Sequence, residues 1–214
     1  MKNKLKYMAL CLSLLIGVGA CSEEEIAYSA GEENKEVILQ LNCQLQTNQE
    51  VIVSRASTAE NRLNDLHFYV FNAAGELTGY KKLVATESSP IPTPGPETVT
   101  VKAITGEAYI YALANLNSTI YYLDDADKNK LTGIDEADVA GSSLTRDEFL
   151  AIDFKRQYGN ASHIISPNPT DGQFMMSGYL NGGKAVTITA GTNGSGVISE
   201  SNVIRLYRIL SKNT

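Results

Sequence analysis

Residues 37–45 alternate between apolar and polar side chains, and this alternation limits the possible folds more than any other stretch of the chain. One face carries the apolar residues Val37, Leu39, Leu41, Cys43 and Leu45, and the other carries Gln40, Asn42 and Gln44. Side chains on successive residues of a β-strand point to opposite faces, so a period of two indicates a strand with one buried face. The segment therefore predicts a half-buried strand that needs a sheet to cover its apolar side.

The rest of the chain repeats this theme in short segments separated by turns. Further strands are expected at residues 50–54, 66–71, 76–83, 99–104, 108–114, 173–176, 185–189 and 203–210. Helical spacing occurs only at residues 134–140 and 145–154, and four prolines within residues 88–96 mark an exposed loop. Many short strands with turns between them predict an all-β protein: an antiparallel β-sandwich with one or two short helices.

The beginning of the chain indicates export. Three lysines precede an apolar run that is too short to span a bilayer and that ends in the small residues Gly19 and Ala20 before Cys21. Small residues let a peptidase reach the backbone, and a thiol can be acylated. This pattern resembles a bacterial lipoprotein signal over residues 1–20, which implies cleavage between Ala20 and Cys21 and a lipid on Cys21. An ordinary secretory signal with a chance cysteine is the alternative.

The residues that follow refine this location. Residues 21–36 are acidic, small and polar, which predicts a flexible tether. An acidic stretch after the lipidated cysteine resembles the surface-export signal of some Gram-negative lipoproteins, and a solvated periplasmic linker is the alternative. Loss of residues 1–20 removes three lysines and changes the net charge from −6 to −9. An acidic chain without a basic cluster is a poor nucleic-acid binder, so no nucleic-acid partner is expected.

One motif superficially resembles a calcium-binding loop. Asp125, Asp127, Asn129 and Glu136 have the spacing of oxygen ligands, but Lys130 stands where such a loop requires glycine. A solvated acidic loop is the preferred interpretation.

Other chemical signatures are weak. His67 and His163 are far apart, and paired cysteines are lacking, so a zinc site is not expected. Once Cys21 is lipidated and the signal is removed, Cys43 has no partner for an internal disulfide. Nucleophile-elbow, phosphate-loop and dinucleotide motifs are also missing from the sequence. The sequence therefore predicts no enzyme, no catalytic residue, no metal and no cofactor.

Several segments, taken in order, resemble the N-terminal domain of fimbrillins, the subunits of type V fimbriae. These segments are residues 54–57, 66–76, 109–115, 174–178 and 204–212. The resemblance implies a transthyretin-like Greek-key β-sandwich over residues 37–214. It also implies a structural subunit of a fimbria at the outer-membrane surface, which serves adhesion or biofilm formation with other fimbrial subunits as partners. Fimbrillins usually continue into a second β-sandwich, and this C-terminal domain is expected to be absent here.

The resemblance further implies proteolytic processing. An arginine-specific protease would cut between Arg55 and Ala56, which would remove the strand at residues 37–45 together with the lipid. The strand's apolar residues Val37, Leu39, Leu41, Cys43 and Leu45 would leave a groove for a strand from a neighbouring subunit. A loop arginine without special function is the alternative for Arg55.

The residues alone also leave open a function in a different class of protein. A monomeric surface lipoprotein could bind a glycan or another ligand, and Tyr121 and Tyr122 are among the candidate aromatic contacts. Tryptophan, the strongest stacking residue for such a site, does not occur in the chain.

Overall fold

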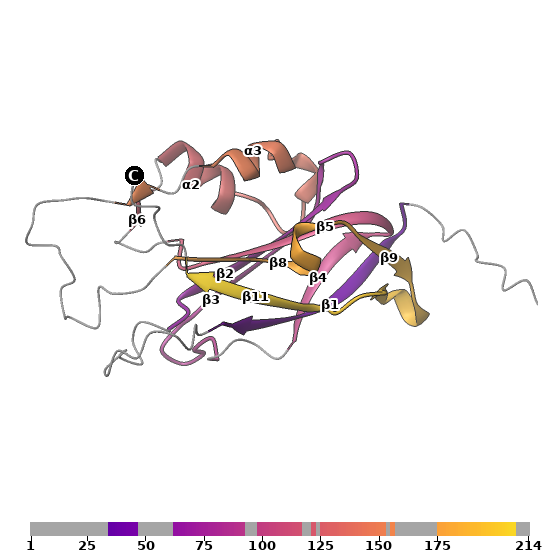
Figure 1. The fold of residues 1–214 in the computed structure, drawn as a ribbon, viewed down its shortest axis with the longest axis horizontal. Helices are drawn as coiled ribbons and strands as arrows, with labels where there is room; N and C mark the ends of the chain where they lie inside the picture. Colours follow the sequence, from indigo (N-terminus) through magenta and orange to yellow (C-terminus); the bar gives the residue numbers. More distant parts are fainter. Residues whose placement is uncertain are drawn as a thin grey trace, which may run out of the picture. The chain divides into compact units, whose positions relative to one another are not determined.

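Short strands and two short helices make up the described part of the chain. The computed structural model describes residues 34–46, 62–92, 98–116, 121–122, 125–152, 155–156 and 175–208. Its strands are β1 (Glu36–Leu45), β2 (Asp65–Asn72), β3 (Leu77–Val84), β4 (Val99–Ile104), β5 (Gly106–Ala114), β6 (Tyr121–Tyr122), β7 (Lys155–Arg156), β8 (Met176–Tyr179), β9 (Val186–Ala190), β10 (Gly196–Ile198) and β11 (Val203–Arg208). The α-helices are α2 (Asp125–Thr132) and α3 (Arg146–Ala151), and short 3₁₀ turns occupy η1 (Val139–Gly141), η3 (Leu180–Gly183) and η4 (Thr192–Gly194) (Figure 1).

Nine of these strands form one sheet. Its order is β10-β9-β5-β8-β11-β1-β4, and β2 pairs with both β5 and β3. Every ladder is antiparallel except that of β1 with β11, which is parallel and aligns Asn42 with Val203. At the two ends of the sheet, β3 and β4 touch where the backbone of Gly79 reaches the carbonyl of Lys102. The sheet is therefore mixed and nearly closed like a barrel, which corrects the expectation of a purely antiparallel β-sandwich.

The strand predictions at residues 37–45, 66–71, 76–83, 99–104, 108–114 and 185–189 are confirmed within one or two residues at each end. The strand expected at residues 173–176 instead begins at Met176 and runs to Tyr179. Residues 50–54 lie outside the described residues. Helix α2 was not predicted, because Leu131 is its only buried residue and its sequence has almost no apolar periodicity.

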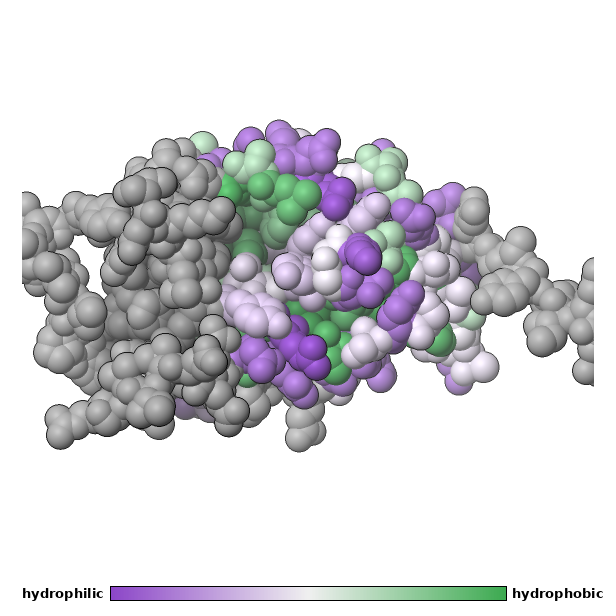
Figure 2. Space-filling model, viewed as in Figure 1, coloured by the Kyte–Doolittle hydropathy of each residue, from purple (hydrophilic) through white to green (hydrophobic). Residues whose placement is uncertain are grey.

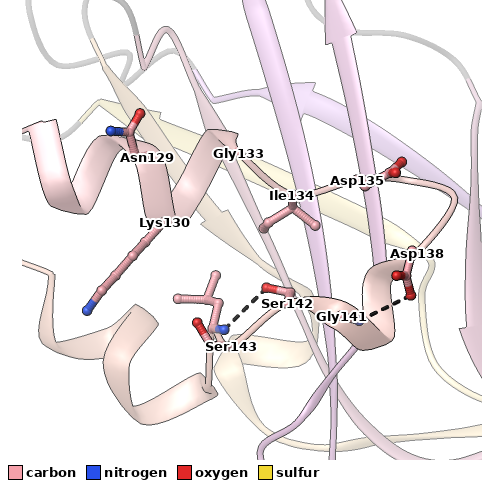
Figure 3. Close-up of a pocket in the computed structure, with 10 residues that line it drawn as sticks. Asn129, Lys130, Gly133, Ile134, Asp135, Asp138, Gly141, Ser142 and Ser143 are labelled. Atoms are coloured by element: carbon pink, nitrogen blue, oxygen red, sulfur yellow. Dashed lines mark hydrogen bonds between the residues drawn. The ribbon is translucent and has the colours of Figure 1, made fainter.

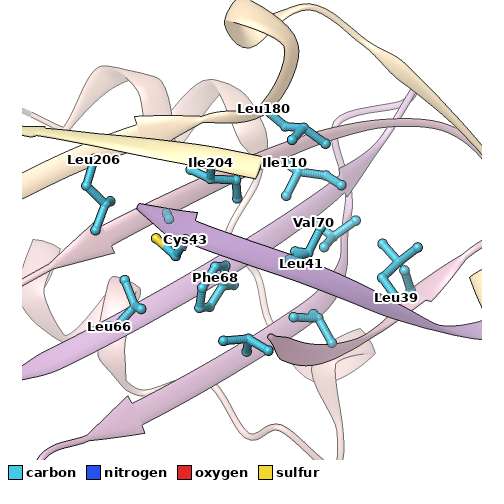
Figure 4. Packing of buried hydrophobic residues seen from close by; sticks show 14 of the residues in the cluster. Leu39, Leu41, Cys43, Leu66, Phe68, Val70, Ile110, Leu180, Ile204 and Leu206 are labelled. Carbon is cyan, nitrogen blue, oxygen red and sulfur yellow. The ribbon is translucent and has the colours of Figure 1, made fainter. Parts of the chain in front are cut away.

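The barrel interior holds the larger hydrophobic cluster. All five apolar residues of β1 belong to it, together with side chains of β2, β4, β5, β8, β9 and β11. Figure 4 shows Leu39, Leu41 and Cys43 projecting from β1 among Phe68, Val70 and other interior side chains. The predicted apolar face of the first strand is thus the face that lines the core.

A second cluster lies on the outer face of β2, β3 and β5. Its aromatic centre consists of Tyr69, Phe71, Tyr80, Tyr111 and Phe149, with ring centroids 4.9–6.0 Å apart. Helices α2 and α3 cover this face (Figure 1). Strand β2 is therefore buried on both sides, while β1 keeps one face in solvent.

Candidate functional site

Strand β1 is the element with the clearest functional geometry. Its inward side chains are almost completely buried: Val37 and Cys43 are 1% exposed, Leu39 and Leu41 0%, and Leu45 9%. The outward Ile38 is 40% exposed. Polar residues interrupt the apolar ones over most of the coloured face in Figure 2. The apolar contacts of β1 therefore come from its inner face.

The two halves of the β1 backbone form ladders with different neighbouring strands. Residues 36–41 pair with β4, and residues 42–45 pair with β11. Beside its first half, Ser195, the residue just before β10, forms a single bridge with Ile38. Within the described sheet, β1 is also the only ladder partner of β4. Removal of β1 would leave two open strand edges, on β4 and β11, beside an uncovered apolar groove.

Side chains and loops hold β1 near its start and near its middle. Near its start, Thr105 accepts a hydrogen bond from Lys35 N through Oγ1 (3.0 Å), and Thr105 N donates to the Lys35 carbonyl (2.9 Å). Near its middle, Asn42 N donates to the Asn202 carbonyl (2.9 Å), and Asn202 Nδ2 donates to the Gln40 carbonyl (3.1 Å). These contacts fix the register of the strand in its groove.

Gly196 of β10 forms part of the wall that receives β1. A Cβ atom at this position would lie 2.6 Å from Leu39 Cδ2 and 2.8 Å from Val37 Cγ2, closer than van der Waals contact allows. Sequence reasoning missed this residue, because Gly194 and Gly196 together look like ordinary turn glycines. Only the approach of β1, more than 150 residues earlier in the chain, makes the absence of a side chain matter here.

Cys43 is the fourth of the five buried residues of β1. Its thiol is free, and burial raises its pKa from 9.0 to about 12, because the thiolate would lose its hydration. A backbone hydrogen bond at Gln44 opposes this shift only in part. In the folded chain Cys43 is therefore an inert core residue rather than a nucleophile.

The helical segment is fixed to the sheet by specific polar contacts. Tyr69 Oη donates to the carbonyl of Leu131 in α2 (2.9 Å), and both groups are buried. The carboxylate of Glu136 accepts hydrogen bonds from Lys81 Nζ and Lys82 N (2.8 Å each). Burial alone would raise the pKa of Glu136, but these hydrogen bonds and the two lysine charges hold it below its ordinary value.

The calcium-like motif does not form a loop. Asp125, Asp127 and Asn129 lie in helix α2, and Glu136 is engaged by the two lysines on β3. Among the described residues, no group of three or more His, Cys, Asp or Glu side chains could hold a metal ion.

His67 lies in β2 and is sealed from solvent. Its Nδ1 is 2.8 Å from Tyr80 Oη, and its Nε2 lies 3.3 Å from Asp65 Oδ1 without hydrogen-bond geometry. His67 is 0% exposed and Asp65 is 2% exposed, so no substrate can reach this pair. His163 lies outside the described residues.

A shallow hollow of about 320 Å³ lies between α2, η1 and the loop before α3 (Figure 3). Its lining is mostly polar and includes Lys130, Asp135 and Asp138. The two carboxylates already accept backbone hydrogen bonds, Asp135 from Ala137 N (2.9 Å) and Asp138 from Gly141 N (3.2 Å). None of the ten lining residues is aromatic, so the hollow offers no stacking surface for a sugar.

The remaining predicted site residues lie outside the described part of the chain. They are Ala20, Cys21, Arg55 and Ala56. Tyr121 and Tyr122 form β6, which pairs with β7. In the residues that the structure describes, no helix is both long and apolar enough to cross a membrane.

A mixed sheet completed by its own first strand, with a helical layer on one outer face, defines the architecture of the described chain. The sequence profile described as "Major fimbrial subunit protein (FimA)" matches residues 40–208. The chain therefore belongs to the fimbrillin (FimA) family, the type V fimbrial subunits of Bacteroidales. This is a family of structural proteins of cell-surface fimbriae. Among curated proteins, none matches the chain.

Solved structures resemble the chain at low sequence identity. The tip fimbrial protein Mfa3 from Porphyromonas gingivalis, with a C-terminal truncation, is 16% identical over 81% of this chain and 48% of its own, with a TM-score of 0.49. The fimbrial anchor protein Mfa2 from the same organism is 13% identical (80% and 50% covered, TM-score 0.42). A fimbrilin (FimA) from P. gingivalis W83 is 12% identical (83% and 40% covered, TM-score 0.38). The chain thus spans at most about half the length of these structures.

Proposed function

We propose that the chain is a structural subunit of a surface fimbria, serving adhesion or biofilm formation, and that it joins other fimbrial subunits by donor-strand exchange. The observation that carries this proposal is the position of β1, which fills an apolar groove between β4 and β11 with five buried side chains. A strand from a neighbouring subunit could satisfy the same backbone edges and fill the same groove. Membership of the fimbrial family supports the assembly of such subunits into a fibre.

The energetics of β1 explain why exchange needs a trigger. Full burial of each large apolar side chain contributes about 1.5–3 kcal/mol, so five of them contribute on the order of 10 kcal/mol as an upper estimate. While β1 is covalently attached, its effective concentration at the groove is in the millimolar range or above. A separate donor strand cannot compete with it. Cleavage of the connection removes this advantage, and β1 can then be replaced.

The proposed trigger is cleavage between Arg55 and Ala56 by an arginine-specific protease. This bond follows β1 and precedes β2, so the cut separates β1 from the remaining sheet without interrupting any later strand. The fragment with β1 would carry the lipid on Cys21, so replacement of β1 by a donor strand would also detach the cut subunit from the outer membrane. After the cut, residues 56–214 carry a net charge of −4.

The test compares Arg55→Ala with the matched control Arg62→Ala. Arg62 is a nearby arginine with an exposed side chain, and its backbone carbonyl accepts a hydrogen bond from Asn115 Nδ2 (3.0 Å). N-terminal analysis and size analysis follow treatment with the protease. Wild type and Arg62→Ala should begin at Ala56 and bind a donor-strand peptide from a partner subunit, whereas Arg55→Ala should stay uncut and monomeric. Equal peptide binding by cut and uncut protein would rule out strand exchange.

The anchor has a separate test. Cys21→Ser should abolish labelling by a fatty-acid probe, because acylation needs the thiol at residue 21. Cys11→Ser changes a cysteine within the signal and should leave labelling intact. Undiminished labelling of Cys21→Ser would disprove lipid attachment at this residue and leave the strand-exchange test unaffected.

A monomeric ligand-binding lipoprotein is the second candidate. The exposed Tyr179 and Tyr207, which are 49% and 40% exposed on the neighbouring strands β8 and β11, favour a surface that could contact a glycan. Failure of peptide binding together with saturable binding of glycans to wild type, lost in Tyr179→Ala, would favour this alternative.

A further inference from the structure

We infer that Gly196 selects the strand that replaces β1, and that this strand carries branched apolar side chains at its first two inward positions. The inference rests on the proposed function and specifies its partner: an extended segment of another subunit with a valine- or leucine-like residue at the places of Val37 and Leu39. Gly196 would therefore be a specificity-determining residue of the groove.

The lack of space for a side chain, and not the backbone conformation, explains why residue 196 is a glycine. The φ angle of Gly196 lies outside the left-handed region, so any residue could adopt its backbone. A Cβ atom there would lie 2.6 Å from Leu39 Cδ2 and 2.8 Å from Val37 Cγ2. Leu39 can yield at the end of its side chain, whereas Val37 is stiff, because its methyl groups branch from Cβ. The space left by the missing side chain of Gly196, the Gly196 notch, is thus filled by two side chains of β1, Val37 and Leu39.

In this half of the groove, β4 forms a continuous ladder with residues 36–41, and side-chain fit has the most weight on the opposite side, beside β10. On the β10 side, the backbone contact is limited to the bridge between Ile38 and Ser195, whereas β11 forms a continuous ladder with the second half of β1. Since the β10 side provides little hydrogen bonding, discrimination there depends on how the side chains fill the space beside Gly196. A small or polar residue at either position would leave an unfilled gap in the core.

The notch also fixes the register. A shift by one residue would turn the apolar face outward. A shift by two in either direction preserves the faces but changes which side chains meet Gly196. Moving β1 by two residues in one direction would bring the longer Leu39 to the tight place of Val37, and moving it in the other direction would bring the charged Lys35 there. The notch therefore favours one alignment of a donor strand with alternating apolar residues.

A competition experiment tests this inference in the Cys21→Ser precursor after cleavage at Arg55. Two peptides of residues 35–46 displace the resident β1 fragment: one with the natural sequence and one with Val37→Ala and Leu39→Ala. Native mass spectrometry monitors the displacement. The measured quantity is the displacement midpoint of the doubly substituted peptide divided by that of the natural peptide, within one protein variant. General destabilisation of the protein cancels in this ratio.

For wild type, the doubly substituted peptide should compete at least tenfold less well than the natural peptide. In Gly196→Val the ratio should fall by at least tenfold or reverse, because the added side chain fills the gap that the smaller peptide leaves. Gly196→Ala, a milder change, should move the ratio in the same direction if Gly196→Val does not fold. Val197→Ala, on the same strand but 50% exposed, should leave the ratio within about twofold.

The outcomes separate the two proposals. If neither peptide displaces β1 from cut wild type, the proposed strand exchange itself is overturned. Displacement with the same ratio in wild type and both Gly196 variants would leave strand exchange intact and overturn the role of Gly196.

Discussion

Cys43 should report whether β1 leaves its groove. In the Cys21→Ser protein without residues 1–20, Cys43 is the only thiol, because Cys11 belongs to the removed segment. Cys43 lies on the inner face of β1 and is 1% exposed. Its reactivity is therefore suppressed for as long as β1 stays in place.

The size of this suppression follows from the pKa of the thiol. Burial raises the pKa of Cys43 from 9.0 to about 12. At pH 8, a thiol with the lower value is about one-tenth ionised, whereas one with the higher value is ionised to about one part in ten thousand. Because the thiolate is the reactive form, alkylation in the folded strand should be about 1,000-fold slower than in a released strand. Exclusion of the reagent from the core slows it further.

The assay is alkylation by iodoacetamide at pH 8, followed by intact mass. The competing peptide contains residues 35–46 with Cys43→Ser, so that the only thiol belongs to the protein's own β1. Uncut protein should stay protected with or without peptide, since its tethered strand returns at once. Cut protein with excess peptide should react at least 100-fold faster than uncut protein.

Two results would refute this reasoning. If uncut protein reacts as fast as cut protein, β1 does not depend on its tether to stay in the groove. If cut protein stays protected in excess peptide, the strand does not exchange. Arg55→Ala treated with the protease is the control and should behave like uncut protein.

Three further predictions concern stability. Leu41→Ala should lower the free energy of unfolding in urea by about 2–5 kcal/mol. Gln40→Ala on the outer face should change it by less than about 0.5 kcal/mol. Equal effects of the two substitutions would contradict the register of β1. Tyr69→Phe should cost about 1–3 kcal/mol in the same measurement, because the carbonyl of Leu131 loses its buried donor, and no change would mean that this bond does not hold α2. The pKa of Glu136 is lowered in the folded state, so its contribution is present above the ordinary value of 4.5 and is lost as pH falls through the folded value. Melting temperatures between pH 7 and 3 should therefore fall less steeply for Glu136→Gln than for wild type, and parallel curves would contradict this assignment.

Much of the β-structure could be predicted from the sequence, because local patterns encode it. The period of two in residues 37–45 identified both the strand and its buried face, and turn residues bounded most other strands. Helix α2 could not be predicted, because it buries one leucine and is bonded to the sheet by one tyrosine hydroxyl, so its sequence lacks the periodic apolar pattern of an amphipathic helix. The processing and lipidation residues remain predictions from sequence alone.

The alternation in residues 37–45 requires an apolar face on the first strand, but the residues that cover this face depend on how the whole sheet folds. The parallel pairing of Cys43 with Ile204, the contact of Gly79 with β4 and the notch at Gly196 all join residues distant in the chain. Such pairings depend on the order in which strands assemble around a shared core, which no local period records. The burial of β2 on both faces likewise required the helices that cover it. Local side-chain alternation is set by backbone geometry, whereas the partners of each strand are set by the packing of the whole sheet.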